Sequence, residues 1–183
     1  DKTVRCWGQN ANGQLGDNST TDRHQPVSVA NISNATAIST GNSHTCALLS
    51  NNTIKCWGNN RQGQLGNGTS TSSRLPVPVS GIKNAISVSI GGDHSCALLQ
   101  DNTLKCWGSN KYGQLGNGTK KNSKLPVSVS EISDVFKVSA TFNHTCAVTK
   151  DHSVKCWGYD VTGRKPEGNV YPSKMDGISG VTT

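Results

Sequence analysis

The sequence predicts an all-β protein whose repeated units each form one blade of a β-propeller, a blade being four short antiparallel strands. Two observations lead to this fold class. First, a Cys-Trp-Gly phrase recurs every 50 residues, at 6–8, 56–58, 106–108 and 156–158. A unit of this length cannot bury its own apolar face, so it must stack on its neighbours. Second, apolar residues make up only 32% of the chain and fall in short runs without a helical period.

The elements of one unit follow from its alternation of apolar runs and turn residues. Strands are predicted at 88–90, 95–99 and 103–107, which are rich in Val, Ile, Leu and Thr. Between them lie turns at 91–93 and 100–102, whose Gly, Asn and Asp residues tolerate unusual backbone angles. A longer loop with several glycines follows, and a fourth strand is predicted to start at Pro126. Four short strands joined in this way are typical of a propeller blade.

The chain is predicted to be a single propeller segment over residues 1–183, with about 3.6 repeats of 50 residues. The repeats run approximately over 1–50, 51–100, 101–150 and 151–183. The last repeat is atypical and incomplete, because no Gln-Leu-Gly phrase follows Trp157. Just before it, Thr141-Phe142-Asn143 stands where the preceding unit has Gly-Gly-Asp. Since the chain begins and ends within a repeat, we expect it to be part of a larger propeller.

The cysteines indicate the register of the predicted hairpins. In each unit two cysteines lie ten residues apart, on either side of a three-residue turn. Residues directly opposite each other on antiparallel strands have Cα atoms about 4.5–5.5 Å apart, within the range of a disulfide. The predicted disulfides are Cys46–Cys56, Cys96–Cys106 and Cys146–Cys156. The alternative is that these cysteines are buried free thiols that pack as small apolar groups.

The seventh cysteine, Cys6, has no partner at this spacing. Its partner is expected ten residues earlier, upstream of Asp1. Disulfides form and persist in oxidising compartments, so the pattern predicts an extracellular or cell-surface protein. No apolar run is long enough to cross a membrane as a helix.

Several phrases of the repeat resemble the regulator of chromosome condensation (RCC1) repeat family. These are G-x-x-H-[ST]-C-A-L, K-C-W-G, G-Q-L-G-N-G-T and L-P-V-x-V, which together extend over essentially the whole chain. The cysteine before the tryptophan and the G-N-G-T phrase are most similar to the bacterial extracellular branch. The resemblance implies a propeller that commonly has seven four-stranded blades, so this chain would supply about half of a ring.

The resemblance also implies a repeated structural core. We expect the tryptophans to fill the space between blades and the leucines of the Gln-Leu-Gly phrase to pack beneath the next blade. Independently of the resemblance, the fixed place of one histidine in each repeat predicts that it stabilises a turn by hydrogen bonding. These core residues are Trp7, Trp57, Trp107, Trp157, Leu15, Leu65, Leu115, His44, His94 and His144.

No catalytic, cofactor or metal site is predicted. The histidines lie two residues before a cysteine, which is not a zinc-ligand spacing. Ser, His and Asp are scattered through every unit without forming a nucleophile, base and orienter in one site. The glycine-rich phrase precedes no predicted helix, so it is not a phosphate-binding loop. We therefore expect a protein that is not an enzyme.

The net charge of +7 raises the question of an acidic partner. Lys120, Lys121 and Lys124 form the densest basic cluster, and Arg164 with Lys165 forms a second. No aromatic residues are interleaved with them, so solvated loops are favoured over a nucleic-acid site.

Seven asparagines begin an N-x-[ST] sequon, the acceptor for N-glycosylation in a eukaryotic secreted protein. They are Asn18, Asn31, Asn34, Asn51, Asn67, Asn117 and Asn143. The abundance of Asn, Ser and Thr alone would give about four by chance, so glycosylation is only a candidate property.

Binding to another protein is the predicted function. The loops that vary between units are 17–25, 67–75, 117–125 and 159–171, and loops on one face of a propeller can recognise a partner. One alternative is a structural subunit that pairs with another copy of itself in an extracellular assembly or filament. A less favoured alternative is guanine-nucleotide exchange on a small GTPase, as in the founding family member. Ultraviolet sensing, another family role, is set aside because its Gly-Trp-Arg-His-Thr phrase is absent.

Overall fold

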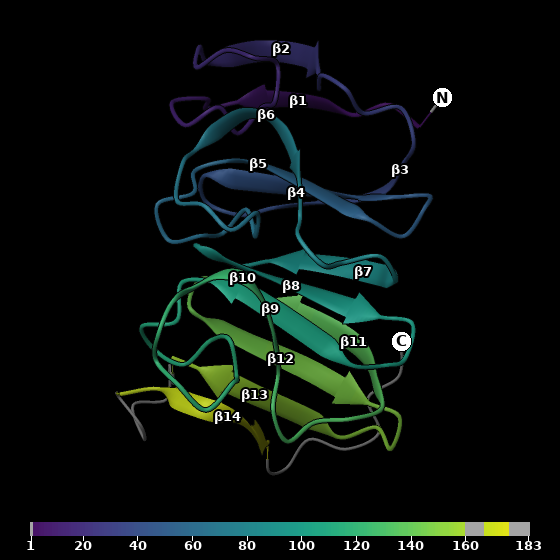
Figure 1. Ribbon diagram of the computed structural model, residues 1–183, viewed down its shortest axis with the longest axis vertical. Coiled ribbons are helices and arrows are strands. Elements are labelled where there is room, and N and C mark those ends of the chain that lie inside the picture. Colours follow the sequence, from purple (N-terminus) through teal and green to yellow (C-terminus); the bar gives the residue numbers. More distant parts are fainter. Residues whose placement is uncertain (1, 160–166, 176–183) are drawn as a thin grey trace.

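The computed structural model describes residues 2–159 and 167–175. Strands and turns make up this part of the chain, and it contains no helix that could cross a membrane. Figure 1 shows the strands stacked in successive layers from the N-terminal to the C-terminal end. The layers therefore follow the order of the repeats in the sequence.

The layers are antiparallel sheets in which each strand pairs with the next one along the chain. A two-stranded sheet contains β1 (Arg5–Gly8) and β2 (Arg23–Ser28). Three four-stranded sheets follow it. Their strands are β3 (Ala35–Thr40), β4 (His44–Leu49), β5 (Ile54–Gly58) and β6 (Ser73–Pro78); β7 (Ala85–Ile90), β8 (His94–Leu99), β9 (Leu104–Gly108) and β10 (Ser123–Ser128); and β11 (Val135–Ala140), β12 (His144–Thr149), β13 (Val154–Gly158) and β14 (Asn169–Lys174). Each of these three sheets is a blade of the predicted kind.

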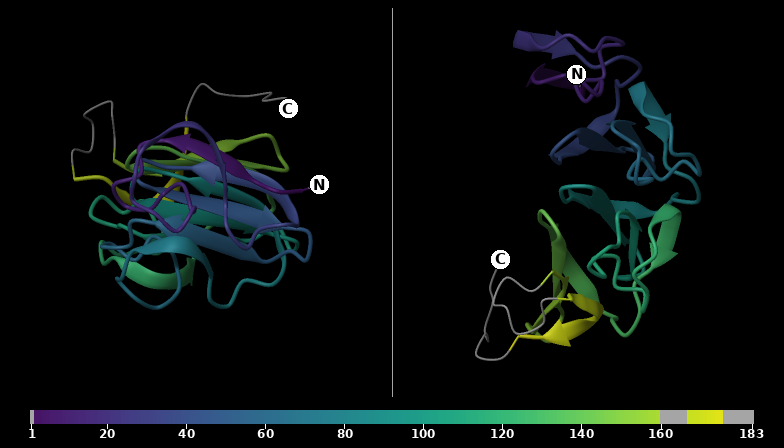
Figure 2. Two further views of the ribbon diagram at one scale, coloured as in Figure 1. Left: turned by 90° about the horizontal axis from the view of Figure 1, so that it is seen from above. Right: turned by 90° about the vertical axis from the view of Figure 1, so that its left-hand side faces the viewer.

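The blades are fanned along an arc, as the right-hand view of Figure 2 shows. The first strands of the blades lie on the concave side, where β7 contacts both β3 and β11. The last strands, β6, β10 and β14, lie on the convex side at the open edge of each sheet. Neighbouring blades of a propeller are arranged in this way around its axis.

The fourth strand of each blade begins earlier than the sequence predicted. In the unit analysed above, β10 begins at Ser123 and not at Pro126. Proline removes a backbone donor, and it is tolerated here because β10 is an edge strand with one unpaired side. The outermost strands all contain a proline, namely Pro26, Pro76, Pro126 and Pro172. Proline on an edge also discourages pairing with another sheet.

The hairpins have the register that the cysteine spacing predicted. Cys46 lies opposite Cys56, and Leu48 lies opposite Ile54. The equivalent residues pair in the same way in the next two blades. The Cα atoms of the three opposed cysteine pairs are 4.0–4.1 Å apart, and the structure joins their sulfur atoms. Cys6 is half-buried and unpaired within the described residues.

The apolar core lies between blades and not within a single one. Trp57, Trp107 and Trp157 are at most 2% exposed. Trp107 packs in one cluster with Leu65 and with residues of the preceding blade. The leucines Leu15, Leu65 and Leu115 are buried in the same way.

The expectation that Trp7 belongs to the core is wrong, because its side chain is 62% exposed. Trp57 is covered by the preceding repeat, where Gly16 lies against its indole ring. Trp7 lies in the first strand, β1, so no described repeat precedes it to supply the same cover. The burial of a repeated residue thus depends on the adjacent unit as well as on its own.

Candidate functional site

A buried polar network links each repeat to the next. The Gln64 carbonyl accepts a hydrogen bond from Trp107 Nε1 at 2.9 Å and another from Ser95 Oγ at 2.9 Å. Gln14 and Gln114 occupy equivalent positions, with Trp57 and Thr45 or Trp157 and Thr145 as donors. Because the two donors belong to strands of the following blade, the network holds neighbouring blades together.

The histidines extend this network across the same interface. His44 Nε2 lies 2.9 Å from Ser95 Oγ, and His94 Nε2 lies 2.8 Å from Thr145 Oγ1. The side chains of His44 and His94 therefore bond to the next blade, and the expectation that they stabilise a turn is wrong for them. His144 does bond within its own turn, where its Nδ1 lies 2.8 Å from Thr141 Oγ1.

Burial keeps two of these histidines neutral. It lowers the pKa of His44 and of His94 to about 3, and in each case a neighbouring histidine adds to the shift. Both Nδ1 atoms are buried and have no hydrogen-bond partner among the described residues. No group of three or more His, Cys, Asp or Glu residues in residues 2–159 and 167–175 could hold a metal ion. The histidines therefore act as elements of the blade interface.

The side chain of a buried asparagine, Asn60, organises the long loop after β5. Asn60 Nδ2 donates to Asn67 Oδ1 and to the carbonyls of Thr69 and Thr71, at 3.0–3.2 Å. Its own Oδ1 accepts from the Leu65 amide at 2.9 Å. Asn10 and Asn110 make the equivalent bonds in their loops. These residues were not singled out from the sequence, although their recurrence at the 50-residue step is a visible signal.

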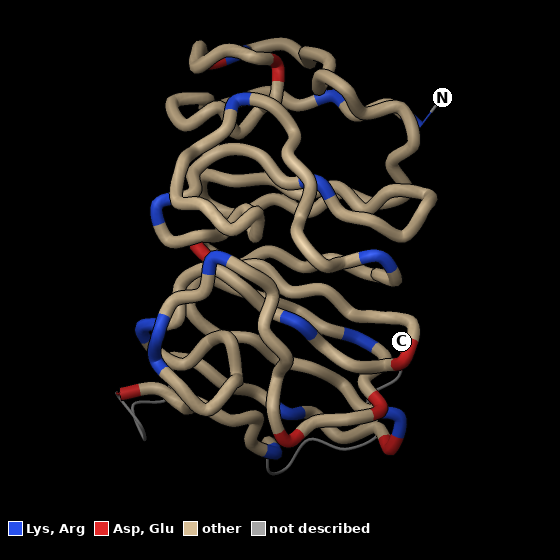
Figure 3. The backbone as a smooth tube through the Cα atoms, in the orientation of Figure 1, with Lys and Arg blue, Asp and Glu red and all other residues tan. Residues whose placement is uncertain are grey.

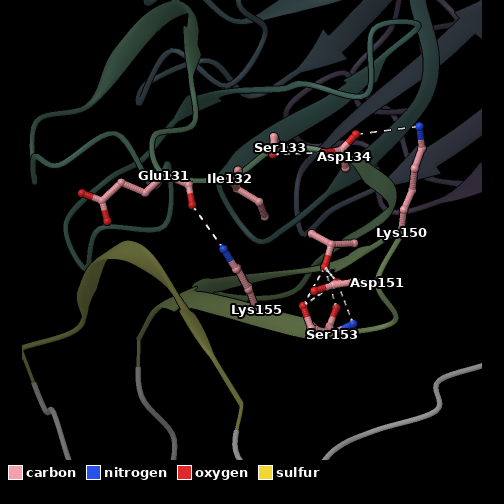
Figure 4. Close-up of a pocket in the computed structure, with 9 residues that line it drawn as sticks. Glu131, Ile132, Ser133, Asp134, Lys150, Asp151, Ser153 and Lys155 are labelled. Atoms are coloured by element: carbon pink, nitrogen blue, oxygen red, sulfur yellow. Dashed lines mark hydrogen bonds and ion pairs between the residues drawn. The ribbon is translucent and has the colours of Figure 1, made fainter.

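A polar pocket of about 800 Å³ lies beside the last described hairpin (Figure 4). The Asp151 carboxylate accepts from Thr149 Oγ1 at 2.5 Å and from the Ser153 amide at 3.1 Å. These two residues hold the pKa of Asp151 at about 2. Asp101 and Asn51 make equivalent bonds to Thr103 and Thr53 in the earlier hairpins. Asp151 is thus part of a turn that recurs in the earlier hairpins.

The exposed loops gather at two opposite ends of the blades. We call one end the loop face: it carries the short turns 41–43, 91–93 and 141–143 and the long loops 9–22, 59–72 and 109–122. We call the other end the hairpin face: it carries the turns 50–53, 100–103 and 150–153 and the connections 29–34, 79–84 and 129–134. Three of the predicted variable loops, 17–25, 67–75 and 117–125, extend from the loop face into the outer strands. The fourth, 159–171, is described only at 159 and 167–171.

Charged residues are distributed unevenly over these ends. Figure 3 shows lysine and arginine along the long loops at the left, and several acidic residues gathered at the lower right. Lys120, Lys121 and Lys124 are all exposed, and Lys120 lies 3.7 Å from Glu167. The second predicted basic cluster, Arg164 and Lys165, lies outside the described residues.

The sequon asparagines differ in their surroundings. Asn18, Asn31 and Asn51 are exposed, whereas Asn34, Asn67, Asn117 and Asn143 are half-buried. Asn67 and Asn117 accept hydrogen bonds from the buried asparagines of their loops. Their recurrence therefore has a structural reason that is independent of glycosylation.

Comparison with known proteins identifies the repeat. Two family models, both described as regulator of chromosome condensation (RCC1) repeat, match the chain. One matches residues 3–48, 56–98 and 102–148, and the other matches 35–64, 85–114 and 137–164. A search of curated protein sequences finds no match.

Solved structures with the same fold include human WBSCR16 and yeast RCC1 (Prp20). The human structure has a TM-score of 0.83 at 21% identity, covering 96% of this chain and 48% of the other. Yeast RCC1 bound to Kap60 has a TM-score of 0.80 at 21% identity, covering 97% of this chain and 46% of the other. The present chain thus spans less than half the length of these chains. The likeness confirms the predicted propeller blades.

Proposed function

Because the chain belongs to the RCC1 repeat family, we propose that it is a non-enzymatic scaffold that binds another protein through its loop face. One observation carries this proposal. Residues of the repeated polar network, such as Asn60, Gln64 and Trp107, are buried, whereas many residues that differ between the long loops, such as Arg61, Ser70 and Lys121, are exposed. Buried repeats build the scaffold, and variable loops on a rigid scaffold are the usual site of recognition.

Structures of the same fold support a protein as the class of partner. Yeast RCC1 was crystallised with Kap60 bound, and Prp20p is described as binding Gsp1p and histones. At 21% identity these partners do not transfer to the present chain. No observation on the described residues favours the two other roles considered above, an assembly subunit and nucleotide exchange on a small GTPase.

We also propose that the protein works outside the cell or on its surface. The support is the opposed cysteine pair in each of three blades, because such pairs persist as disulfides where the surroundings are oxidising. When the protein is unfolded in denaturant without reductant, rapid alkylation should label Cys6 at most. Labelling of all seven cysteines would contradict both the disulfides and this location.

The binding proposal can be tested without knowing the natural partner. A random peptide library displayed on phage is selected against the immobilised chain, and the selected peptides are then titrated against variants. We expect a loop-face substitution, Ser70→Arg or Phe142→Ser, to weaken binding by about tenfold or more. Lys83→Glu on the hairpin face is the matched control and should leave affinity unchanged. Binding that maps only to the hairpin face, or no selected binder, would contradict the proposal.

A further inference from the structure

Within the described residues, two aromatic side chains of the loop face pack together where the third and fourth repeats meet. The rings of Tyr112 and Tyr159 pack edge to face with centroids 5.0 Å apart. Lys111 Nζ lies 5.3 Å from the centroid of the Tyr112 ring. The positions equivalent to Tyr112 hold Asn12 and Gln62, which are not aromatic. We call Tyr112, Tyr159 and Phe142 the aromatic patch.

Phe142 is the most exposed large apolar side chain of the described residues, at 63%. It replaces Asn42 and Gly92 of the earlier turns, and its ring lies beside Gly92. A Cβ atom at Gly92 would lie 2.7 Å from the Phe142 carbonyl oxygen and 3.2 Å from Phe142 Cδ2, so the glycine lets the turn that carries Phe142 approach closely. Of the other exposed apolar residues, Trp7 lies in the first strand of the described chain, and Ile38 and Ile86 lie in the concave strands. Leu125 and Tyr171 lie in the outer strands β10 and β14, and Met175 follows β14.

Backbone hydrogen bonds fix the aromatic patch in place. The Gly92 amide donates to the carbonyls of Thr141 and Phe142, at 3.1 and 3.0 Å. The Tyr159 amide donates to the Asn143 carbonyl at 2.9 Å. The turn that carries Phe142 is therefore bonded both to the preceding repeat and to Tyr159. A surface that is ordered before binding loses less entropy when it binds.

Exposed basic residues lie on the loop face that carries the aromatic patch, and one of them, Lys111, lies over the Tyr112 ring. Arg61, Lys111 and Lys121 are exposed on the loop face and make no ion pair within the described residues. Among the described residues, Asp93 is half-buried and accepts a hydrogen bond from Gln64 Nε2, and Glu167 lies beside Lys120. The loop face thus offers unpaired positive charge next to exposed aromatic rings.

We propose that the aromatic patch is the contact site for an acidic protein surface with an apolar depression that receives Phe142. This inference rests on the proposed function and names its contact residues and the charge of the partner. Tyr, Phe and basic residues at the centre of an interface commonly supply most of the binding energy. A protein is favoured over single-stranded nucleic acid because the two tyrosine rings already pack edge to face against each other, and so form no open stack for bases.

The selected peptides described above also test this inference. We expect them to be rich in Asp and Glu and to contain at least one large apolar residue. Phe142→Ser and Lys111→Glu should each weaken their binding about tenfold or more. Ile86→Ser is the matched control, since Ile86 is 47% exposed but lies on a concave strand. It should leave binding unchanged.

The outcomes separate this inference from the proposed function. Peptides that lose affinity with Ser70→Arg but not with Phe142→Ser would overturn the aromatic patch and leave loop-face binding intact. Selected peptides that are not enriched in Asp and Glu would also overturn the inference about the aromatic patch. A thymidine oligonucleotide that competes with the peptides and loses affinity with Phe142→Ser would assign the patch to nucleic acid. Failure of every loop-face substitution to affect binding would overturn both proposals.

Discussion

A hydroxyl group has one proton, and this fixes the protonation state of the buried histidines. Ser95 Oγ donates its proton to the Gln64 carbonyl, so it can only accept from His44 Nε2. His44 must therefore carry its proton on Nε2, with Nδ1 as an unpaired acceptor. The same reasoning applies to His94 and Thr145. A second proton on either ring would place an unpaired charge in the blade interface.

This arrangement predicts that acid destabilises the protein. The pKa of His94 is about 3 in the folded state against an ordinary value of 6.5, so below pH 6.5 the unfolded chain binds more protons than the folded one. The free energy of unfolding should fall by about 2 kcal/mol per buried histidine between pH 8 and pH 5. Urea unfolding at the two pH values measures this difference. His94→Gln should reduce the pH dependence by about that amount, whatever its effect at pH 8.

His24 provides the matched control, because it is an exposed histidine on the outer strand β2. The substitution His24→Gln should leave the pH dependence of unfolding as it is in the parent chain. Equal pH dependence in His94→Gln and the parent would show that burial of His94 does not control acid stability.

Two glycines allow backbone strain and steric overlap to be measured separately. Gly66 and Gly81 have φ angles of 67° and 70°. A Cβ at Gly66 would lie 2.7 Å from Trp107 Nε1, whereas a Cβ at Gly81 would meet nothing within 4 Å. The position of Gly81 is occupied by Asn31 and Glu131 in other repeats, also at positive φ. Alanine at Gly81 should therefore cost only about 1 kcal/mol.

Gly66→Ala should cost at least about 2 kcal/mol more than Gly81→Ala, because the indole ring it meets is held by its bond to Gln64. Equilibrium unfolding in urea compares the two variants directly. Equal losses of the free energy of unfolding would mean that the Trp107 indole ring moves away at little energetic cost.

At the scale of the element, the loop after β5 depends on one amide. The Asn60 side chain presents its NH2 group to oxygen atoms of Asn67, Thr69 and Thr71. Asn60→Asp keeps the shape of the side chain but turns a donor into an acceptor facing these oxygens. The substitution should cost about 3 kcal/mol or more in the free energy of unfolding, since buried acceptors would lose their donor. Hydrogen exchange should be faster throughout residues 61–72.

Asn42→Asp is the corresponding change at an exposed asparagine of a short turn. It should alter the free energy of unfolding by no more than about 0.5 kcal/mol. If both substitutions had small effects, the loop would be held by its other contacts and not by the amide of Asn60.

The whole molecule shows which features a repeated sequence determines. The step of 50 residues and the spacing of the cysteines predicted the strands and the register of each hairpin, because these contacts form within one unit. Contacts between units were harder to infer. His44 forms a hydrogen bond with Ser95, which is 51 residues later in the chain. The sequence alone does not show that the turns 41–43 and 91–93, which precede these residues, lie next to each other. The aromatic patch was not predicted for the same reason, since Tyr112 and Tyr159 belong to different repeats and their rings meet only when the repeats stack.

The same dependence on neighbours predicts that identical tryptophans contribute differently to stability. Trp107 is fully buried against the preceding repeat and donates to the Gln64 carbonyl, whereas Trp7 is 62% exposed. Trp107→Phe should lower the free energy of unfolding by about 1–3 kcal/mol, through the lost hydrogen bond and the space left between blades. Trp7→Phe should change it by less than about 0.5 kcal/mol. Urea unfolding of the two variants measures these changes. Equal losses of the free energy of unfolding would mean that stability resides within each blade. The expected difference would mean that it resides in the interface between blades.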